Sequence, residues 1–300
     1  MADGVIGCGV VGAGVFGGYH ARKTASLAGA ALAGVMDPSL AKARALAEPL
    51  GAQGFDDFDA LLDRADAIIV TAPAAAHADL AARALAAGKP VYVEKPLATT
   101  SGDAWALVAA AAKAGLVLAC GHQERLVMGA MGLFDTPETA FRIESVRRGP
   151  PSDRNLDVSC VQDLMVHDLD LARALAGGEP VDVQAIGSPD AVRAAVTFES
   201  GLTALFDASR VADERARTMR IFYGTGIVEI DFLAPSFRNP AYFKLNARFA
   251  ETPEGRDPLG ASVASFLAAI RGEAARPAIT GEEGARAVDL ALAVERAAGF

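Results

Sequence analysis

The stretch Gly88-Lys89-Pro90-Val91-Tyr92-Val93-Glu94-Lys95-Pro96-Leu97 decides the fold that we expect. Residues 91–93 form a short apolar run between Gly-Lys-Pro and Pro96, which is typical of a buried parallel strand. In open α/β sheets, ligands bind just outside the carboxyl ends of the strands. Lys95 is therefore expected to meet a ligand, although a surface lysine at a strand end would show the same local pattern.

A glycine-rich turn follows the first apolar run, residues 5–11. Two glycine triplets have the spacing of a dinucleotide-binding turn, one over residues 7–12 and one over residues 12–17. Only the later triplet follows a complete strand and opens a helix, which we expect from residue 15 to about residue 28. We therefore assign the turn to Gly12-Ala13-Gly14-Val15-Phe16-Gly17.

Each residue of this turn has a physical task in binding a dinucleotide. Gly12 would permit the tight turn, Gly14 would let the pyrophosphate approach the backbone, and Gly17 would let the helix pack on the strand. The N–H groups of Val15 and Phe16 would face the phosphates at the helix N-terminus.

A carboxylate follows the second expected strand, residues 32–36. Asp37 comes 20 residues after Gly17, where a carboxylate would accept hydrogen bonds from an adenosine ribose. The same charge would repel a 2′-phosphate, so the sequence favours NAD over NADP as the cofactor. A simple turn at Asp37-Pro38-Ser39 is the alternative.

The alternation of strands and helices continues to Cys120. Further strands are expected at 67–71 and 116–120, and helices at 40–50, 77–87 and 101–114. Strands that alternate with helices of this length predict a parallel sheet with right-handed crossovers. We expect six strands in all, which make residues 1–121 a Rossmann NAD-binding domain.

The pattern changes after Gly121. Strand-like runs occupy residues 141–147, 181–186, 192–199, 202–209, 217–223, 226–232 and 243–249, and helices are expected at 160–175, 259–270 and 284–297. Short turns at Ser200-Gly201 and Gly224-Thr225-Gly226 predict antiparallel hairpins. Residues 122–300 should therefore form an α+β domain with an open, mostly antiparallel sheet that binds substrate, and the chain as a whole an α/β protein. Because helices usually cover one face of such a sheet, the other face could mediate a homodimer or homotetramer.

Two polar residues on the expected helix at 160–175 suggest acid/base chemistry. Asp163 and His167 are four residues apart, so both would project from one helical face. Histidine has an unperturbed pKa near about 6.5, which suits proton exchange at neutral pH, and a neighbouring carboxylate would orient it. A solvated polar face is the alternative.

Four motifs together resemble the glucose–fructose oxidoreductase / inositol dehydrogenase / rhizopine-catabolism (Gfo/Idh/MocA) family. They are Gly12-x-Gly14-x-x-Gly17-x-x-His20, Thr71-x-Pro73-x-x-x-His77, the Glu94-Lys95-Pro96 block, and Asp163-x-x-x-His167-Asp168-x-Asp170. The resemblance runs from Val5 to the end of the chain and implies an NAD-dependent oxidoreductase acting on a sugar or polyol hydroxyl. It implies catalytic roles for Lys95, Asp163 and His167 beside the nicotinamide, and cofactor contacts from Thr71, Ala72, Pro73, His77, Glu94 and Lys95. The Asn that commonly follows Pro73 in the family is Ala74 here.

The residues around Gly121–Arg125 and Asp163–Asp170 look most like family members that oxidise the 3-hydroxyl of UDP-N-acetylhexosamines. Residues 147–155 form a basic loop rich in Pro and Gly, and arginine suits bidentate phosphate contacts. The expected substrate residues are therefore Lys95, Arg125, Arg147, Arg148, Arg154, Asp163 and His167. A solvated loop, a non-catalytic NAD(H)-binding regulator and an NAD-using glycosidase remain open alternatives.

Composition excludes several other classes of protein. A net charge of −9 and a pI near 5.0 argue against binding to nucleic acid or to an anionic membrane. Three scattered cysteines fit neither a disulfide framework nor a zinc site, and no His/Cys/acid spacing suggests a metal. Because no signal peptide is visible and no apolar run reaches the roughly 18 residues of a membrane span, we expect a cytoplasmic protein.

Overall fold

The computed structural model describes residues 4–152 and 157–300. The chain divides into two compact units. Unit 1 contains the chain up to Gln123 together with Asp257–Ala285, and unit 2 contains Glu124–Arg256 together with Arg286–Phe300.

Unit 1 is built on a six-stranded sheet in the order β3-β2-β1-β4-β5-β6, with every neighbouring pair parallel. The strands are β1 (Ile6–Val11), β2 (Ala30–Met36), β3 (Gln53–Phe55), β4 (Ala67–Val70), β5 (Val91–Glu94) and β6 (Leu118–Gly121). The predicted six-stranded parallel sheet is thus confirmed. The strand that the sequence pattern did not locate is β3, which has only three residues.

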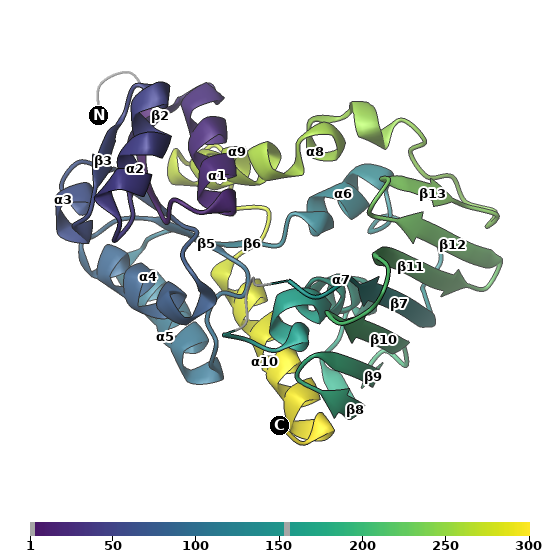
Figure 1. Cartoon of the computed structure of the whole chain (residues 1–300). Helices are drawn as coiled ribbons and strands as arrows, with labels where there is room; N and C mark the ends of the chain where they lie inside the picture. The colour runs from purple at the N-terminus through teal and green to yellow at the C-terminus, as the bar shows by residue number, and fades with distance from the viewer. Residues whose placement is uncertain (1–3, 153–156) are drawn as a thin grey trace. The chain divides into compact units, whose positions relative to one another are not determined.

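Helices cover both faces of this sheet (Figure 1). They are α1 (Val15–Ser26), α2 (Leu40–Ala47), α3 (Phe58–Leu62), α4 (His77–Ala86), α5 (Ser101–Ala114) and α9 (Pro258–Ile270), with short 3-10 turns at Glu48–Leu50 and Ala74–Ala76. Every residue of β4 and β5 is buried, as expected for strands enclosed by helices on both sides.

The two units are not consecutive in the chain, because helix α9 follows the sheet of unit 2 in sequence but belongs to unit 1. Sequence alone assigned all of residues 122–300 to the second domain, whereas α9 belongs to unit 1. Its side chains Val263 and Phe266 are fully buried in one cluster with Ile69 and Tyr92 of the parallel sheet. Helix α10 (Gly281–Ala298) then begins in unit 1 and ends in unit 2.

Unit 2 is built on a seven-stranded sheet in the order β13-β12-β11-β7-β10-β9-β8. The strands are β7 (Arg142–Arg148), β8 (Pro180–Ser188), β9 (Ala191–Phe198), β10 (Thr203–Ser209), β11 (Ala216–Tyr223), β12 (Gly226–Asp231) and β13 (Ser236–Arg238). β7 and β10 are parallel, and the other five pairings are antiparallel. The predicted mostly antiparallel sheet and both predicted hairpins, β9–β10 and β11–β12, are confirmed.

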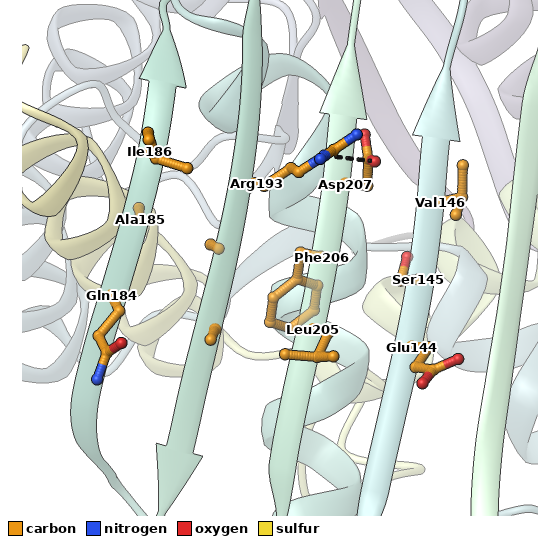
Figure 2. Close-up of a pocket in the computed structure, with 12 residues that line it drawn as sticks. Glu144, Ser145, Val146, Gln184, Ala185, Ile186, Arg193, Leu205, Phe206 and Asp207 are labelled. Carbon is orange, nitrogen blue, oxygen red and sulfur yellow. Dashed lines mark hydrogen bonds and ion pairs between the residues drawn. The ribbon is translucent and has the colours of Figure 1, made fainter.

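The two faces of this sheet differ because successive strand residues point to opposite sides. On the inner face, Ile143 of β7 and Phe206 of β10 join a core with helix α7 (Val166–Ala176) and the second half of α10. On the outer face, Leu205 is 38% exposed and Ile186 is 75% exposed. These outer residues border a depression of about 550 Å³. Figure 2 shows the side chains that line it.

Three local expectations for unit 2 were wrong. Residues 243–249 form no strand, because Asn246 turns the chain: its amide nitrogen donates to the carbonyl oxygen of Ala130 and its side-chain oxygen accepts from the N–H of Arg248. Helix α6 (Glu124–Met131) was not anticipated. The helix expected at 160–175 begins as a π-helix, Val161–Met165, and continues as α7.

The remaining short helices of unit 2 are a 3-10 turn at Phe249–Glu251 and α8 (Pro253–Arg256). Among the described residues, no helix is both long enough and apolar enough to cross a membrane. Cys8, Cys120 and Cys160 are buried free thiols, and burial raises the pKa of Cys8 and of Cys160 to about 12.

Candidate active site

The glycine turn of unit 1 lies at residues 12–17, as predicted from the later of the two glycine triplets. β1 ends at Val11 and α1 begins at Val15, whereas two glycines of the earlier triplet lie within the strand. Gly12 has a φ of +103°, and a Cβ there would lie 2.9 Å from the carbonyl oxygen of Thr71. A Cβ on Gly17 would lie 1.8 Å from the carbonyl oxygen of Gly12, whereas one on Gly14 would meet open space. Glycine is therefore required at two positions by crowding, and the third leaves the turn accessible to a ligand.

Asp37 lies beside this turn at the carboxyl end of β2. One carboxylate oxygen accepts a hydrogen bond from the N–H of Ala13 at 2.9 Å, and the other accepts from the N–H of Ser39 at 2.9 Å. These bonds fix the carboxylate against the glycine turn. Each oxygen keeps a second lone pair, as a ribose diol would need.

Thr71 and His77 hold the loops that follow β4 and β5. The Thr71 hydroxyl donates to the carbonyl oxygen of Val11 at 2.8 Å, which ties the end of β4 to the end of β1. The His77 ring lies between two carbonyl oxygens, with Nδ1 2.7 Å from that of Pro96 and Nε2 2.8 Å from that of Ala72. Burial lowers the pKa of His77 below its usual value near 6.5, although both carbonyls oppose this change. His77 therefore braces the backbone of the loop that contains Ala72 and Pro73.

Glu94 is the centre of a buried network at the end of β5. Its carboxylate accepts from Gln123 at 2.7 Å and lies 2.7 Å from Nε2 of His20, and its second oxygen is 3.3 Å from the N–H of Lys95. Burial alone would raise the pKa of Glu94, but His20 and Gln123 outweigh it and lower that pKa. A Cβ on Gly121 would lie 2.7 Å from this carboxylate, so glycine makes room for it.

These contacts change the role expected for Glu94. Only 5% of the residue is exposed, and its oxygens already accept hydrogen bonds within the protein. The carboxylate is thus better suited to hold the strand end than to contact a cofactor. Lys95, the next residue, is half-buried at the carboxyl end of β5, where sequence predicted it. His20, the last residue of the glycine motif, is fully buried and is the partner of the Glu94 carboxylate.

Asp163 and His167 lie on the helical segment of unit 2, but not on a regular α-helix. Asp163 is in the π-helix, and His167 is in the first turn of α7; both are half-buried. π-helical turns occur frequently at functional sites. The wider turn changes how the two side chains are offset, so the simple i, i+4 geometry expected from sequence does not apply.

Ser159 and Glu295 fasten the start of this segment. The Ser159 hydroxyl oxygen accepts from the N–H of Val161 at 3.1 Å, and the hydroxyl donates to the carboxylate of Glu295 on α10. Gln162 donates to the same carboxylate, 3.2 Å from each oxygen. Nothing in the local sequence indicates this long-range anchor.

Arg147, which we expected to bind phosphate, instead forms ion pairs with carboxylates inside the protein. It is 2% exposed, and its guanidinium donates two hydrogen bonds to Asp168, each 2.9 Å long, and further bonds to Glu124. Burial opposes its charge, but these two carboxylates raise the pKa of Arg147 above its usual value. Arg125 similarly makes a bidentate pair with buried Asp170. The arginines lock α6 and α7 together beside His167.

Two further arginines were expected to bind phosphate, Arg148 and Arg154. Arg148 faces the opposite side of the sheet from Arg147 and pairs with Asp207 on the outer face. Arg154 lies outside the described residues. One feature of the sequence could have indicated that Arg125 and Arg147 form internal ion pairs. Asp168 and Asp170 lie in an apolar helix and are buried, and buried carboxylates require cationic partners. No group of three His, Cys, Asp or Glu that could hold a metal occurs within residues 4–152 and 157–300.

A glycine turn on a parallel sheet, followed by a carboxylate at the end of the second strand, defines a dinucleotide-binding protein. Comparison with family models agrees. Residues 6–122 match the oxidoreductase family model with an NAD-binding Rossmann fold, and residues 138–229 match the GFO/IDH/MocA C-terminal domain. The chain belongs to the Gfo/Idh/MocA family of NAD-binding oxidoreductases, as its motifs suggested.

Several characterised relatives are similar to this chain. It is 36% identical to a UDP-N-acetylglucosamine 3-dehydrogenase from Acidithiobacillus ferrooxidans over 95% of each protein. It is 31% identical to an inositol 2-dehydrogenase from Rhizobium meliloti over 68% of each. The solved structure of the Acidithiobacillus ferrooxidans enzyme superimposes with a TM-score of 0.88, at 34% identity and 97% coverage of both chains. The two relatives named here are dehydrogenases of a sugar nucleotide and of an inositol.

The residues of unit 1 fit the NAD that the family binds. The positive φ of Gly12, the open space at Gly14 and the oriented carboxylate of Asp37 are the features that a pyrophosphate and an adenosine ribose require. NAD supplies a hydride acceptor when it is bound. The chain is thus an NAD-dependent oxidoreductase.

Proposed function

We propose that this protein oxidises a secondary hydroxyl of a sugar nucleotide, with a UDP-N-acetylhexosamine as the favoured substrate. The observation that carries the proposal is the match to a UDP-N-acetylglucosamine 3-dehydrogenase along 95% of the chain. The inositol 2-dehydrogenase quoted above is less similar in sequence, at 31% identity over 68% of the chain. A sugar-nucleotide substrate is consistent with this difference.

The proposed chemistry uses Lys95, Asp163 and His167. His167 removes the proton of the substrate hydroxyl, and the hydride on the same carbon would pass to the bound NAD, which leaves a ketone. The Lys95 ammonium donates a hydrogen bond to the same oxygen and stabilises the negative charge that develops on it. Asp163 orients the base or binds a neighbouring hydroxyl. General acid–base assistance of this kind contributes about 10²- to 10⁴-fold to the rate.

A substrate screen tests the proposal. The protein is incubated with NAD and, separately, with UDP-N-acetylglucosamine, UDP-N-acetylgalactosamine, the free hexoses and myo-inositol, and NADH absorbance is followed. We expect net NADH formation with a UDP-N-acetylhexosamine. NADH formation with inositol alone would overturn the substrate class, and binding of NAD with no NADH formation from any sugar would favour a regulator or a glycosidase that retains its cofactor.

The outer face of the unit 2 sheet supports self-association as a homodimer or homotetramer. Ile186 and Leu205 expose apolar surface there, and Arg193 and Asp207 form an ion pair beside them (Figure 2). Replacing Leu205 with Glu would place an unpaired charge in such an interface. We expect the wild type to sediment as a dimer or larger and the Leu205→Glu variant as a monomer. A wild-type monomer at every concentration would contradict this proposal.

The proposed location is the cytoplasm. Its support is chemical: the described cysteines are buried thiols that form no disulfide, as is usual in a reducing compartment. Fractionation of cells that express the full chain, followed by detection of the protein, would test this directly. Recovery in an extracellular or membrane fraction would contradict it.

A further inference from the structure

Two arginines of unit 2 stand out against the other arginines of this region. Arg147, Arg148, Arg125 and Arg210 all make ion pairs with carboxylates. Within the described parts of the chain, the guanidinium groups of Arg215 and Arg217 take part in no hydrogen bond or ion pair, and both residues are exposed. Asp213 and Glu214 precede them but pair with neither. These two cations are therefore available to a ligand.

The pleat of the sheet determines where Arg217 lies. In β11, Met219, Ile221 and Tyr223 are buried on the inner face, and Arg217 has the same parity. Arg217 is also paired directly across the strands with Arg147 of β7. Arg217 is consequently on the face of the sheet that carries α7, and its cross-strand neighbour Arg147 is hydrogen-bonded to Asp168, the residue after His167.

Arg215 lies beside the turn that leaves β7. A Cβ built on Gly149 would lie 3.8 Å from Cγ of Arg215, so this side chain passes over the Gly149 backbone. The N–H of Gly149 donates to Ser209, and the Gly149 carbonyl accepts from Ala212, which fixes the turn beneath it. The stem of Arg215 therefore rests on an ordered backbone.

Arg215 and Arg217 are two cations that could hold an anion at this position. Arg147 is already offset by Glu124 and Asp168. Asp213 and Glu214 precede Arg215 in the chain but form no ion pair with either arginine within the described residues. Desolvation by the neighbouring residues and the like charge of Arg147 lower the pKa of Arg217. An arriving phosphate would relieve this repulsion and could accept bidentate hydrogen bonds.

We propose that Arg217 and Arg215 bind the diphosphate of the sugar-nucleotide substrate. The inference rests on the proposed function and replaces Arg125, Arg147 and Arg148 in the phosphate role that sequence assigned to them. It also explains why the diphosphate can be recognised on the same face of the sheet as His167, whereas Arg148 faces away from it.

Calorimetric titration of the full chain with UDP, inorganic pyrophosphate and uridine tests this proposal. The variants are Arg217→Ala, Arg215→Ala, Arg217→Lys and the double alanine variant. Arg248→Ala is the matched control, since it removes an exposed arginine of unit 2 whose ion-pair partner among the described residues is Glu251. Affinity for NAD is measured in parallel, because NAD also contains a pyrophosphate.

We expect each alanine variant to weaken UDP and pyrophosphate binding by about ten- to a hundred-fold, the effect of losing a charge-assisted hydrogen bond. Arg217→Lys should recover part of the affinity, because it keeps the charge but not the planar fork. NAD affinity and the Arg248→Ala control should remain within several-fold of wild type. If Arg217→Ala fails to fold, the exposed Arg215→Ala variant carries the test.

Unchanged UDP affinity in the double variant would overturn the inference. So would a wild type that reduces NAD with an unphosphorylated sugar and binds neither UDP nor pyrophosphate, although the chain would remain a dehydrogenase. Conversely, loss of UDP binding in Arg217→Ala without NADH formation from any sugar would support this site and refute the proposed oxidation.

Discussion

Arg147 and Arg148 are neighbours in the chain, yet they face opposite sides of the sheet and serve different partners. A basic run in the sequence suggested a common phosphate role, but the pleat separates the two guanidinium groups. Arg147 pairs with Glu124, which lies 23 residues before it, and with Asp168, which lies 21 residues after it. Pairing over such distances depends on the tertiary fold, so the motif predicted the residue types near the site but not their contacts.

Asp37 is the residue at which cofactor choice can be tested. Replacing Asp37 with Ser removes the carboxylate that we propose binds the adenosine ribose and that the N–H groups of Ala13 and Ser39 hold in place. We expect NAD affinity to fall by about ten- to a hundred-fold, the loss of charge-assisted hydrogen bonds, while NADP affinity falls less or rises. Asp57→Ser is the control, since Asp57 also follows a strand but caps α3. Equal losses for NAD and NADP in fluorescence titrations would refute the assignment.

His77 predicts a pH dependence of stability. Because burial lowers its folded-state pKa below the usual value near 6.5, the unfolded chain takes up the proton more readily as the pH falls. The stabilising contribution of neutral His77 is therefore complete above about pH 6.5 and is lost as the pH falls toward the folded-state pKa. The slope can reach about 1.4 kcal/mol per pH unit for one proton.

Urea unfolding of wild type and His77→Gln at a series of pH values from 7.5 to 5.5 measures this effect. Gln cannot titrate but can still donate to one of the two carbonyl oxygens. We expect the free energy of unfolding of the variant to be lower at neutral pH and to depend less steeply on pH. Parallel curves for the two proteins would show that His77 does not titrate on unfolding.

At the scale of elements, the local sequence pattern predicted the strands of the parallel sheet more accurately than the helical segment of unit 2. Apolar runs bounded by Gly and Pro located β1, β4 and β5 within one or two residues. The π-helix at Val161–Met165 has no compositional signature, because its hydrogen-bond pattern depends on anchors such as Glu295, more than 130 residues away. Residues 243–249 alternate between apolar and polar side chains as a strand would. In the structure the Asn246 side chain instead accepts from the nearby N–H of Arg248 and donates to the distant carbonyl of Ala130, and the segment is a loop.

Ser159→Ala tests whether the π-helix matters to catalysis. The substitution removes the oxygen that accepts from Val161 and the hydroxyl that donates to Glu295. Loss of a capping side chain of this kind typically costs about 0.5–2 kcal/mol. We expect kcat to fall several-fold as Asp163 and His167 lose their alignment, with NAD affinity unchanged because the dinucleotide contacts are in unit 1.

Thr100→Ala is the matched control, since Thr100 caps α5 in unit 1 by accepting from the N–H of Asp103. It should lower the free energy of unfolding by a similar amount with wild-type kcat. Equal kcat for Ser159→Ala and wild type, at a temperature where both are folded, would mean that the helix start does not position the catalytic pair.

At the scale of the whole molecule, the family and the two architectures follow from the order of motifs along the chain. The division into units does not follow, because α9 is an ordinary Ala- and Leu-rich helix whose sequence carries no indication of the sheet it covers. Its attachment to unit 1 becomes evident only when Val263 and Phe266 are found in the core beside Tyr92. Along the chain, the parallel sheet of unit 1 comes first, the sheet of unit 2 follows, and residues 257–285 belong to unit 1 again.

The central claim is that Lys95 and His167 act on one substrate oxygen, and a kinetic comparison tests it most directly. Single-turnover NADH formation is measured for wild type, Lys95→Ala, His167→Ala and the double variant with a UDP-N-acetylhexosamine. We predict that each single variant loses about 10²- to 10⁴-fold in rate with NAD affinity within several-fold of wild type, and that the double variant loses less than the product. Wild-type turnover in Lys95→Ala would contradict the account.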